Sequence, residues 1–483
     1  MSKPAFLAAE HAKVHMLELL SLQKRAQMLK GEPDARLRKD RLARAISLLL
    51  NHRDDLIAAL VEDFGARSPD MSMLTDIVAA IAPLKHARDN LDAWMRPQKR
   101  KVSPAALGLL GARAEVRYQP KGVVGVMTPW NFPVQLSFDA IAGALGAGNR
   151  VMLKPSEFTP ATGALMAQLI DLYFDDDELA VVLGGADVGA VFAGLAFDHL
   201  IFTGATSVGR HVMRAAAENL TPVTLELGGK SPVVISRGAD MAKSAARIMA
   251  GKAMNAGQVC LAPDYVLTPR ESIDLFLKEA VASGARMFPT IRDNPDYTAM
   301  INQRHFDRVR NLVADAKSKG ARVIEINPAN EDLSQQEHRK IPLTLVLDAT
   351  DDMGLMQEEI FGPVLPVRTY AVFEDAIAEV NARERPLGLY YFGDDAEESE
   401  ALLSRTHSGG VTINDVIFHI SQENLPFGGV GPSGIGAYHG HRGFLEFSHE
   451  KAVYRQTNSE IIAMFRPPYG AAFRKQVAAR LKG

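Results

Sequence analysis

The first patterned part of the chain has apolar residues at helical spacing among many charged ones. It covers residues 34–65, and its apolar positions are Leu42, Ile46, Leu49, Ile57 and Leu60. A helix with one apolar face needs a neighbour that covers this face. We therefore predict an amphipathic helical layer that flanks another part of the fold.

After Gly122 the pattern changes to short β-rich runs that alternate with helical stretches. The predicted strands are residues 123–126, 151–153, 180–183 and 199–202, and the predicted crossover helices include residues 161–173 and 208–217. This alternation is typical of a doubly wound parallel sheet. A second alternating block at 233–410 predicts another α/β unit, in which the polar segment 328–342 is expected on the surface.

Length and charge narrow the kind of protein. With 483 residues the chain is too long for one ordinary core, so we expect two or three structural units. Its 54 basic and 57 acidic residues give a formal net charge of −3. Such a balance gives no strong positive electrostatic field that would attract nucleic acid or an anionic membrane. We expect a small-molecule substrate, with no nucleic-acid or membrane partner.

The N-terminal residues, the stretch 122–148 and the number of cysteines indicate where in the cell the protein is expected. The first twenty residues contain Lys3 and Glu10 among other charges, so no signal peptide is expected. The weakly charged stretch 122–148 contains Pro129, Pro133 and Asp139, which argues against a membrane-spanning helix. One cysteine forms neither an intramolecular disulfide nor a four-cysteine metal site. We therefore expect a cytoplasmic protein and predict no metal site.

Cys260 is the first candidate for chemistry. It ends the sequence Asn-Ala-Gly-Gln-Val-Cys at residues 255–260, a small and polar approach that can expose a thiol. A lone cysteine is more often a small core residue. A nucleophilic cysteine needs a base, an oxyanion donor and an acceptor for electrons or a leaving group.

Two residues meet the first two of these needs, the base and the oxyanion donor. Glu226 interrupts the apolar run 225–227 before a double glycine, and its apolar flanks predict partial desolvation. Desolvation raises the pKa of a carboxyl group towards the range of a general base, although the residue could also be an edge charge. Asn131 has an amide that can donate to an oxyanion. It stands between Pro129 and Pro133 and so could equally be a turn residue.

A cofactor site is predicted at residues 203–209. There Gly204 and Gly209 follow an apparent strand and open an apparent helix, whose first N–H groups suit a pyrophosphate. The pattern is Gly-x-Thr-x-x-Gly in place of the usual Gly-x-Gly-x-x-Gly, so the signal is weak by itself. Lys154 and Glu157 follow another apparent strand, where open α/β sheets bind ligands.

Taken together, these motifs resemble the aldehyde dehydrogenase superfamily, in the expected order from Thr128 to Gly440. Cys260 follows Glu226 by 34 residues, the separation between base and nucleophile that the resemblance implies. Further matches are residues 358–363 and the glycine-rich 426–434. Residues 414–416, 437–440 and 466–469 resemble the class 3 branch, and within it the bacterial coniferyl-aldehyde dehydrogenases.

The resemblance implies an α/β fold with two Rossmann-like parallel-sheet domains and a small oligomerisation arm. The expected parts are a cofactor domain (1–104 and 124–228), a catalytic domain (229–422), the arm (105–123 and 440–460) and a C-terminal tail (461–483). It also implies a homodimer and NAD as cofactor, with NADP as an alternative. The implied cofactor contacts are Thr128, Trp130, Lys154, Glu157, Gly204, Gly209, Glu359 and Phe361.

The predicted reaction is oxidation of an aromatic, coniferyl-type or medium-chain aldehyde to its acid. Cys260 attacks the aldehyde, Asn131 and the Cys260 N–H hold the oxyanion, and Glu226 activates the water that hydrolyses the thioester. One rival is a CoA-acylating relative, against which Glu226 argues; another is a non-catalytic protein on the same scaffold. In a late loop, Phe418 and His419 are candidate substrate contacts, but they could equally be core and surface residues.

Overall fold

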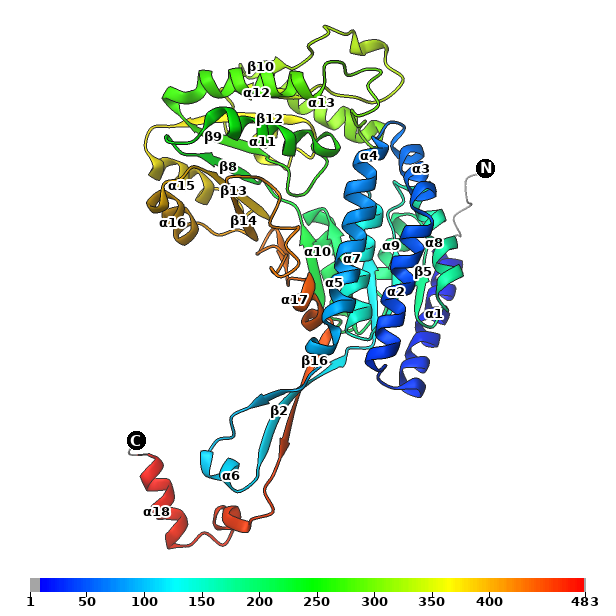
Figure 1. Ribbon diagram of the computed structural model, residues 1–483, viewed down its shortest axis with the longest axis vertical. Coiled ribbons are helices and arrows are strands. Elements are labelled where there is room, and N and C mark those ends of the chain that lie inside the picture. The colour runs from blue at the N-terminus through cyan, green and yellow to red at the C-terminus, as the bar shows by residue number, and fades with distance from the viewer. Residues whose placement is uncertain (1–8, 482–483) are drawn as a thin grey trace.

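The computed structural model describes residues 9–481. Two bodies with parallel sheets lie side by side, and a narrow arm extends from between them (Figure 1). Residues 1–8 of the predicted cofactor domain and residues 482–483 of the predicted tail lie outside the described part. No helix within residues 9–481 is both long and apolar enough to cross a lipid bilayer.

The first body contains a six-stranded sheet in the order β15-β7-β6-β3-β4-β5. Its strands are β3 (Val123–Met127), β4 (Arg150–Lys154), β5 (Leu179–Val181), β6 (His199–Gly204), β7 (Val223–Leu227) and β15 (Gly434–Ile435). All neighbouring strands are parallel except the pair β15 and β7. Every residue of β3 and β4 is buried, as is usual where helices cover both faces of a parallel sheet. The predicted doubly wound sheet is confirmed.

Helices cover this sheet on both faces. The crossover helices are α7 (Pro133–Gly146), α8 (Pro160–Tyr173), α9 (Ala186–Ala193) and α10 (Thr206–Ala217). The N-terminal layer comprises α1 (Ala9–Lys30), α2 (Ala35–Asn51), α3 (Arg53–Phe64), α4 (Pro69–Ser72), the π-helical turn η1 (Met73–Val78) and α5 (Ala79–Trp94). The predicted amphipathic segment is thus two helices, because the backbone leaves helical geometry at His52. Asp34 caps the first of them by accepting from Leu37 N.

The second body contains a seven-stranded sheet in the order β10-β11-β12-β9-β8-β13-β14. Its strands are β8 (Pro232–Ile235), β9 (Tyr265–Pro269), β10 (Arg322–Glu325), β11 (Thr344–Leu347), β12 (Val364–Tyr370), β13 (Gly388–Phe392) and β14 (Gly410–Ile413). Its helices are α11 (Met241–Ala253), η2 (Met254–Gly257), η3 (Arg270–Ser272), α12 (Ile273–Met287), α13 (Gln303–Ser318), η4 (Leu333–Gln335), α14 (Gly354–Gln357), α15 (Phe373–Asn381) and α16 (Ala396–Arg405). Only the edge strand β10 is antiparallel, so the second predicted α/β unit is also confirmed.

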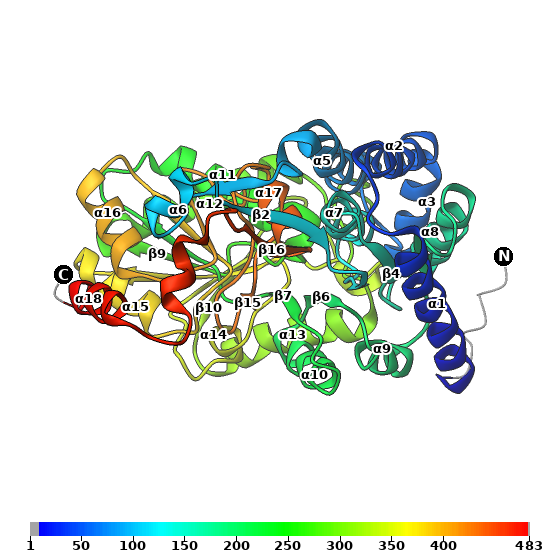
Figure 2. The ribbon, with the colours of Figure 1, turned by 90° about the horizontal axis from the view of Figure 1, so that it is seen from below.

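The arm is a three-stranded antiparallel sheet in the order β1-β2-β16. It is formed by β1 (Gln98–Arg100), β2 (Arg113–Pro120) and β16 (Ser448–Arg455), with α6 (Ala105–Leu109), η5 (Glu460–Phe465) and α18 (Ala471–Arg480) beyond them. Seen from below, β2 and β16 lie in front of the junction between the two bodies (Figure 2).

Two predicted limits of the arm need correction. The boundary at residue 104 is too late, because β1 pairs with β2; three residues are too few to show a strand in the sequence pattern. The limit at residue 440 is too early, because α17 (Gly440–Glu446) packs against α5 and α7 of the first body. There Phe444 is fully buried beside Trp94.

Candidate active site

Cys260 follows a turn with an unusual backbone. Asn255, Ala256 and Gly257 of η2 have φ values of 49°, 54° and 71°, in the left-handed region. A side chain at Gly257 would overlap the carbonyl oxygen of Gly362, so the turn requires glycine there. Residues with side chains hold such conformations mainly where the surroundings enforce them, often at functional sites. The turn leaves the Cys260 residue partly buried in the wall of a cavity.

Buried hydrogen bonds enforce this turn. The Gln258 side chain donates to the carbonyl oxygens of Asn255 (2.9 Å) and Ala299 (3.0 Å) and accepts from Ile301 N (3.0 Å). Gln258 is fully buried, so these bonds are shielded from water. The backbone around Cys260 is therefore held within its own turn and from the loop before α13.

Glu226 lies on β7 and is 1% exposed. Burial raises its pKa to about 8, and burial also raises the pKa of the Cys260 thiol well above its ordinary value, with the nearby Glu226 carboxylate adding to the rise. Two acidic groups in one buried space do not ionise together readily. The predicted desolvation of Glu226 is thus present, and it is more complete than the apolar neighbours in the sequence indicated.

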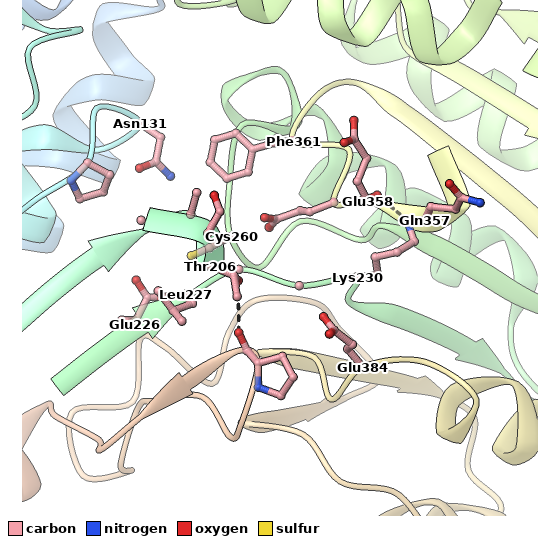
Figure 3. Close-up of a pocket in the computed structure, with 18 of the residues that line it drawn as sticks. Asn131, Thr206, Glu226, Leu227, Lys230, Cys260, Gln357, Glu358, Phe361 and Glu384 are labelled. Atoms are coloured by element: carbon pink, nitrogen blue, oxygen red, sulfur yellow. Dashed lines mark hydrogen bonds between the residues drawn. The ribbon is translucent and has the colours of Figure 1, made fainter. Parts of the chain in front are cut away.

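Asn131 lies in the loop between β3 and α7 and is 2% exposed. Its side-chain Nδ2 donates to Gln258 O at 3.1 Å, and its own carbonyl oxygen accepts from Arg67 Nη1 (2.9 Å) and Asn255 Nδ2 (3.1 Å). Figure 3 shows Asn131 on one side of the Cys260 sulfur and Glu226 on the other. The structure therefore brings together the three residues that the sequence singled out for catalysis.

A cavity of about 790 Å³ opens at Cys260. The predicted residues in its wall are Trp130, Asn131, Gly204, Glu226, Cys260, Glu359 and Phe361. Residues 204–207 at the start of α10 also line it, so the first N–H groups of that helix are close to the cavity. Phe361 packs edge-on against Trp130, with ring centroids 5.4 Å apart, and has a left-handed φ of 47°.

Four predicted cofactor residues do not line this cavity. Thr128 is buried with its hydroxyl 3.0 Å from that of Ser137. Lys154 Nζ lies 3.5 Å from Glu157 Oε2 beside the carboxyl end of β4, away from the cavity wall. Gly209 is inside α10, where a Cβ would lie 2.7 Å from Leu227, so this glycine lets the helix pack on β7.

The cavity has features that suit a bound dinucleotide. The Glu359 carboxyl group has one buried oxygen, Oε1, without a hydrogen-bond partner among the described residues. Burial raises its pKa to about 8, with Asp264 adding to the rise. A side chain at Gly228 would overlap this carboxyl group, so the neighbouring backbone approaches closely. A ribose hydroxyl would satisfy the unpaired oxygen, and the open start of α10 favours phosphate.

Several buried charged residues near the site were not predicted from the sequence. Arg67 and Asp76 form a fully buried pair at 2.5 Å, and Asp76 also accepts from Val134 N at the start of α7. His439 lies 2.6 Å from Asp139. Asp139 had a signal, because it is the only charge in the apolar helix α7. Arg67 and Asp76 stand among many other charges, and their burial could not be read from the pattern.

The two late-loop candidates have different surroundings. Phe418 is 58% exposed. His419 is partly buried, its Nδ1 lies 2.9 Å from Thr412 Oγ1, and burial lowers its pKa to about 4. The loop folds the His419 ring against Gly410 and Phe427, whereas the exposed Phe418 is not a core residue, which was one of the two expectations for it.

Comparisons with known proteins agree with one another. The model of the aldehyde dehydrogenase family matches residues 21–453. The chain is 60% identical over 484 residues to a probable coniferyl aldehyde dehydrogenase from Caulobacter vibrioides, covering 100% of both chains. It is 53% identical over 454 residues to a coniferyl aldehyde dehydrogenase from a Pseudomonas species, covering 94% of this chain and 93% of the relative.

Solved structures show the same likeness. A Staphylococcus aureus protein, AldH in its substrate-bound state, superposes with a TM-score of 0.90 at 32% identity, covering 96% of this chain and 99% of that one. An aldehyde dehydrogenase from Mycobacterium tuberculosis complexed with NAD+ superposes with a TM-score of 0.83 at 27% identity, covering 94% and 92%. The fold that positions Cys260 is therefore shared with these enzymes.

Proposed function

The chain belongs to the aldehyde dehydrogenase family, and we propose that it oxidises coniferyl-type, other aromatic or medium-chain aldehydes to carboxylic acids with NAD. The observation that carries the proposal is the meeting of Cys260, Glu226 and Asn131 around one cavity. The substrate class follows from the relatives that are 60% and 53% identical, whose names specify coniferyl aldehyde.

Cys260 has the first task. An aldehyde does not readily lose hydride, because an acylium ion would remain. Addition of the Cys260 thiolate to the carbonyl carbon gives a tetrahedral oxyanion, from which hydride can depart as the carbonyl re-forms. The raised pKa of the thiol means that little thiolate is present at neutral pH before ligands enter. Positive charge brought close to the sulfur would increase this fraction.

Asn131 has the second task. Its amide and the Cys260 N–H would donate to the developing oxyanion, and a single donor of this kind contributes about 3 kcal/mol to lowering the barrier. The loop of Asn131 is fixed from both sides, by Arg67 and by Asn255. Fixed donors are effective because they need no reorganisation during the reaction.

NAD would be held by Glu359, Phe361 and the first residues of α10, which line the cavity. When bound there, it supplies the acceptor for the hydride and a positive ring near the thiol.

Glu226 completes the turnover. Its carboxylate would take a proton from water, which attacks the thioester carbonyl carbon and displaces the Cys260 thiolate. A buried carboxyl group beside the nucleophile favours hydrolysis over transfer of the acyl group to CoA. The pKa of about 8 is near the working pH, where a general base is most effective.

We extend the proposal to assembly and location. The arm extends beyond the body with an exposed surface on β16, which makes it the natural dimer contact. A nucleophilic thiol must stay reduced, which favours the cytoplasm. Light scattering at several concentrations tests the dimer; a monomer at every concentration would contradict it.

A kinetic panel tests the function. Coniferyl, cinnamyl, benzyl and medium-chain aldehydes are supplied with NAD or NADP, and reduced cofactor and acid product are both measured. Cys260→Ser is expected to form neither, while Met28→Leu, at an exposed site on α1, serves as the control. Undiminished turnover by Cys260→Ser would exclude the mechanism. Reduced cofactor and acyl-CoA formed only when CoA is present, without free acid, would replace it with the acylating reaction.

A further inference from the structure

Arg67 and Asp76 form an ion pair that is closed to water. Arg67 lies between α3 and α4, and Asp76 lies in the π-helical turn η1, a kind of turn that is frequent at functional sites. Nη2 of Arg67 is 2.5 Å from Oδ2 of Asp76, and both side chains are 0% exposed. Apolar residues of similar size are often at least as stable in such a place. A gain in stability therefore does not explain the pair.

The guanidinium group of Arg67 holds the loop that carries Asn131. Its Nη1 donates to the backbone oxygen of Asn131 at 2.9 Å. The centre of the same group lies 5.3 Å from the ring centroid of Phe132, the next residue of the loop, and 4.5 Å from that of Phe64. A guanidinium group is planar and donates in fixed directions. Arg67 therefore fixes both the position and the direction of this loop.

Asp76 holds the other end of the same loop. Its Oδ1 accepts from Val134 N at 3.2 Å and from Gln135 N at 3.4 Å. Both N–H groups belong to the first turn of α7, where the helix itself offers them no partner. The loop of Asn131 leads directly into this turn. One carboxylate thus fixes the start of α7 and also the cation that holds Asn131.

The Asn131 side chain is oriented by the turn of the nucleophile. Its Nδ2 donates to the backbone oxygen of Gln258 at 3.1 Å, and Gln258 precedes Cys260 by two residues. An amide nitrogen carries two hydrogens, so the second one remains for a substrate oxyanion. Asn131 lies in the cavity wall with Cys260 (Figure 3). A continuous line of buried hydrogen bonds therefore runs from Asp76 through Arg67 and Asn131 to Gln258.

We propose that Arg67 and Asp76 are positioning residues for the oxyanion donor. Neither residue lines the cavity. They hold the Asn131 amide where its free hydrogen meets the oxygen that becomes negative when Cys260 adds to the aldehyde. Their task rests on the proposed function, in which Asn131 is that donor. A charge pair of the N-terminal layer thereby acts on the first chemical step.

A displaced amide would slow the steps that pass through an oxyanion. Hydride leaves from the tetrahedral oxyanion, and a displacement of about 1 Å can slow such a step by about 100-fold. The proposed contacts of NAD are Glu359, Phe361 and the start of α10, so the affinity for NAD should not change. Alkylation of the Cys260 thiol needs no oxyanion donor and should also be unchanged.

Stopped-flow measurement of the first hydride transfer by the full-length protein tests this task. Arg67→Met with Asp76→Leu replaces the pair by apolar residues, so that neither charge is left alone in the interior. The matched control is Arg88→Met with Asp89→Leu, which removes an arginine–aspartate pair at the surface of α5. We expect the test variant to bind NAD and to react with iodoacetamide like the control, and to transfer the first hydride about 100-fold more slowly.

A second variant keeps a positive charge beside Asp76. Arg67→Lys lacks the forked group that reaches the Asn131 oxygen, so its first hydride transfer should be slowed as well. Folded variants of both kinds that transfer hydride at the control's rate would overturn the positioning task. Variants in which NAD affinity and thiol alkylation fall together with hydride transfer would also overturn it, because the distortion would then be general.

Combination with Asn131→Ala shows whether the pair acts through Asn131. In that case the variant lacking both the pair and the amide is no slower than Asn131→Ala alone. Two losses that multiply would overturn the positioning task. A slow Asn131→Ala beside a fast pair variant refutes this task alone. If Asn131→Ala is as fast as the control, or if unmodified protein transfers no hydride from any aldehyde, the proposed function fails and the positioning task fails with it.

Discussion

Glu226→Gln is predicted to make the folded protein more stable and the enzyme slower. The folded state raises the pKa of this carboxyl group from 4.5 to about 8 because burial disfavours the charged form. Between these values the folded chain retains a proton that the unfolded chain releases. The free energy of unfolding therefore falls as the pH rises through this window. Below about pH 4.5 both states keep the proton, so Glu226 does not lower the free energy of unfolding there.

The magnitude follows from the same shift. At pH 7 the protein is 2.5 units above the ordinary pKa of 4.5, and each unit corresponds to about 1.4 kcal/mol, so retaining Glu226 costs about 3 kcal/mol. Glutamine has nearly the same shape and no charge. The free energy of unfolding of the variant should therefore exceed that of the unmodified protein by about 3 kcal/mol at pH 7, by somewhat more at pH 8, and by little at pH 4.5.

Urea unfolding at pH 4.5, 6, 7 and 8 measures this gain. Glu400→Gln is the control, because Glu400 is exposed on α16. A gain that is the same at every pH, or no gain at all, would refute the reasoning from burial. The kinetic counterpart is a first turnover that is retained and a hydrolysis step slowed by a factor of about 10² or more.

Three further substitutions test other parts of the site. Asn131→Ala should slow the first hydride transfer by about 10²-fold or more in stopped-flow measurements, with cofactor affinity unchanged; an unaltered rate would remove Asn131 from the oxyanion site. Gly257→Ala should lower the free energy of unfolding by about 2 kcal/mol or more, because its Cβ would overlap Gly362 O at a positive φ; equal urea midpoints would show that the turn can relax. Asp76→Ala should lower the free energy of unfolding by about 3–5 kcal/mol, because it leaves Arg67 charged and buried. The double variant Arg67→Met with Asp76→Leu should recover most of this loss. A double variant as unstable as the single one would contradict the reasoning.

The sequence predicted those parts of the site that short motifs carry. Cys260, Glu226 and Asn131 each stand in a local pattern with a chemical meaning, and the structure brings them to one cavity. The strands and several crossover helices of the first body were also predicted, and the second body was predicted as an alternating block without its individual elements, because hydrophobic runs and helical spacing are local signals.

Features that depend on distant pairings could not be predicted in this way. Asp139 and His439 are 300 residues apart in the chain, and nothing in either neighbourhood shows that they meet. Gly209 was assigned to the cofactor from its place in a glycine motif, whereas its position inside α10 is fixed by packing against Leu227. Strand β1 has three residues and is recognised only by its partner β2.

Ionisation of Glu226 is needed for activity but lowers the stability of the folded protein. Hydrolysis needs the ionised carboxylate, whose fraction rises about tenfold per pH unit until the pH reaches about 8. The same ionisation removes stability over the same range, because the charge forms in a buried place. His439 moderates this conflict, since positive charge on its ring lowers the pKa of Glu226, and the pKa of His439 is itself raised because Asp139 outweighs the effect of burial. The buried pair of His439 and Asp139 thus makes the ionised form of Glu226 less costly in the folded protein.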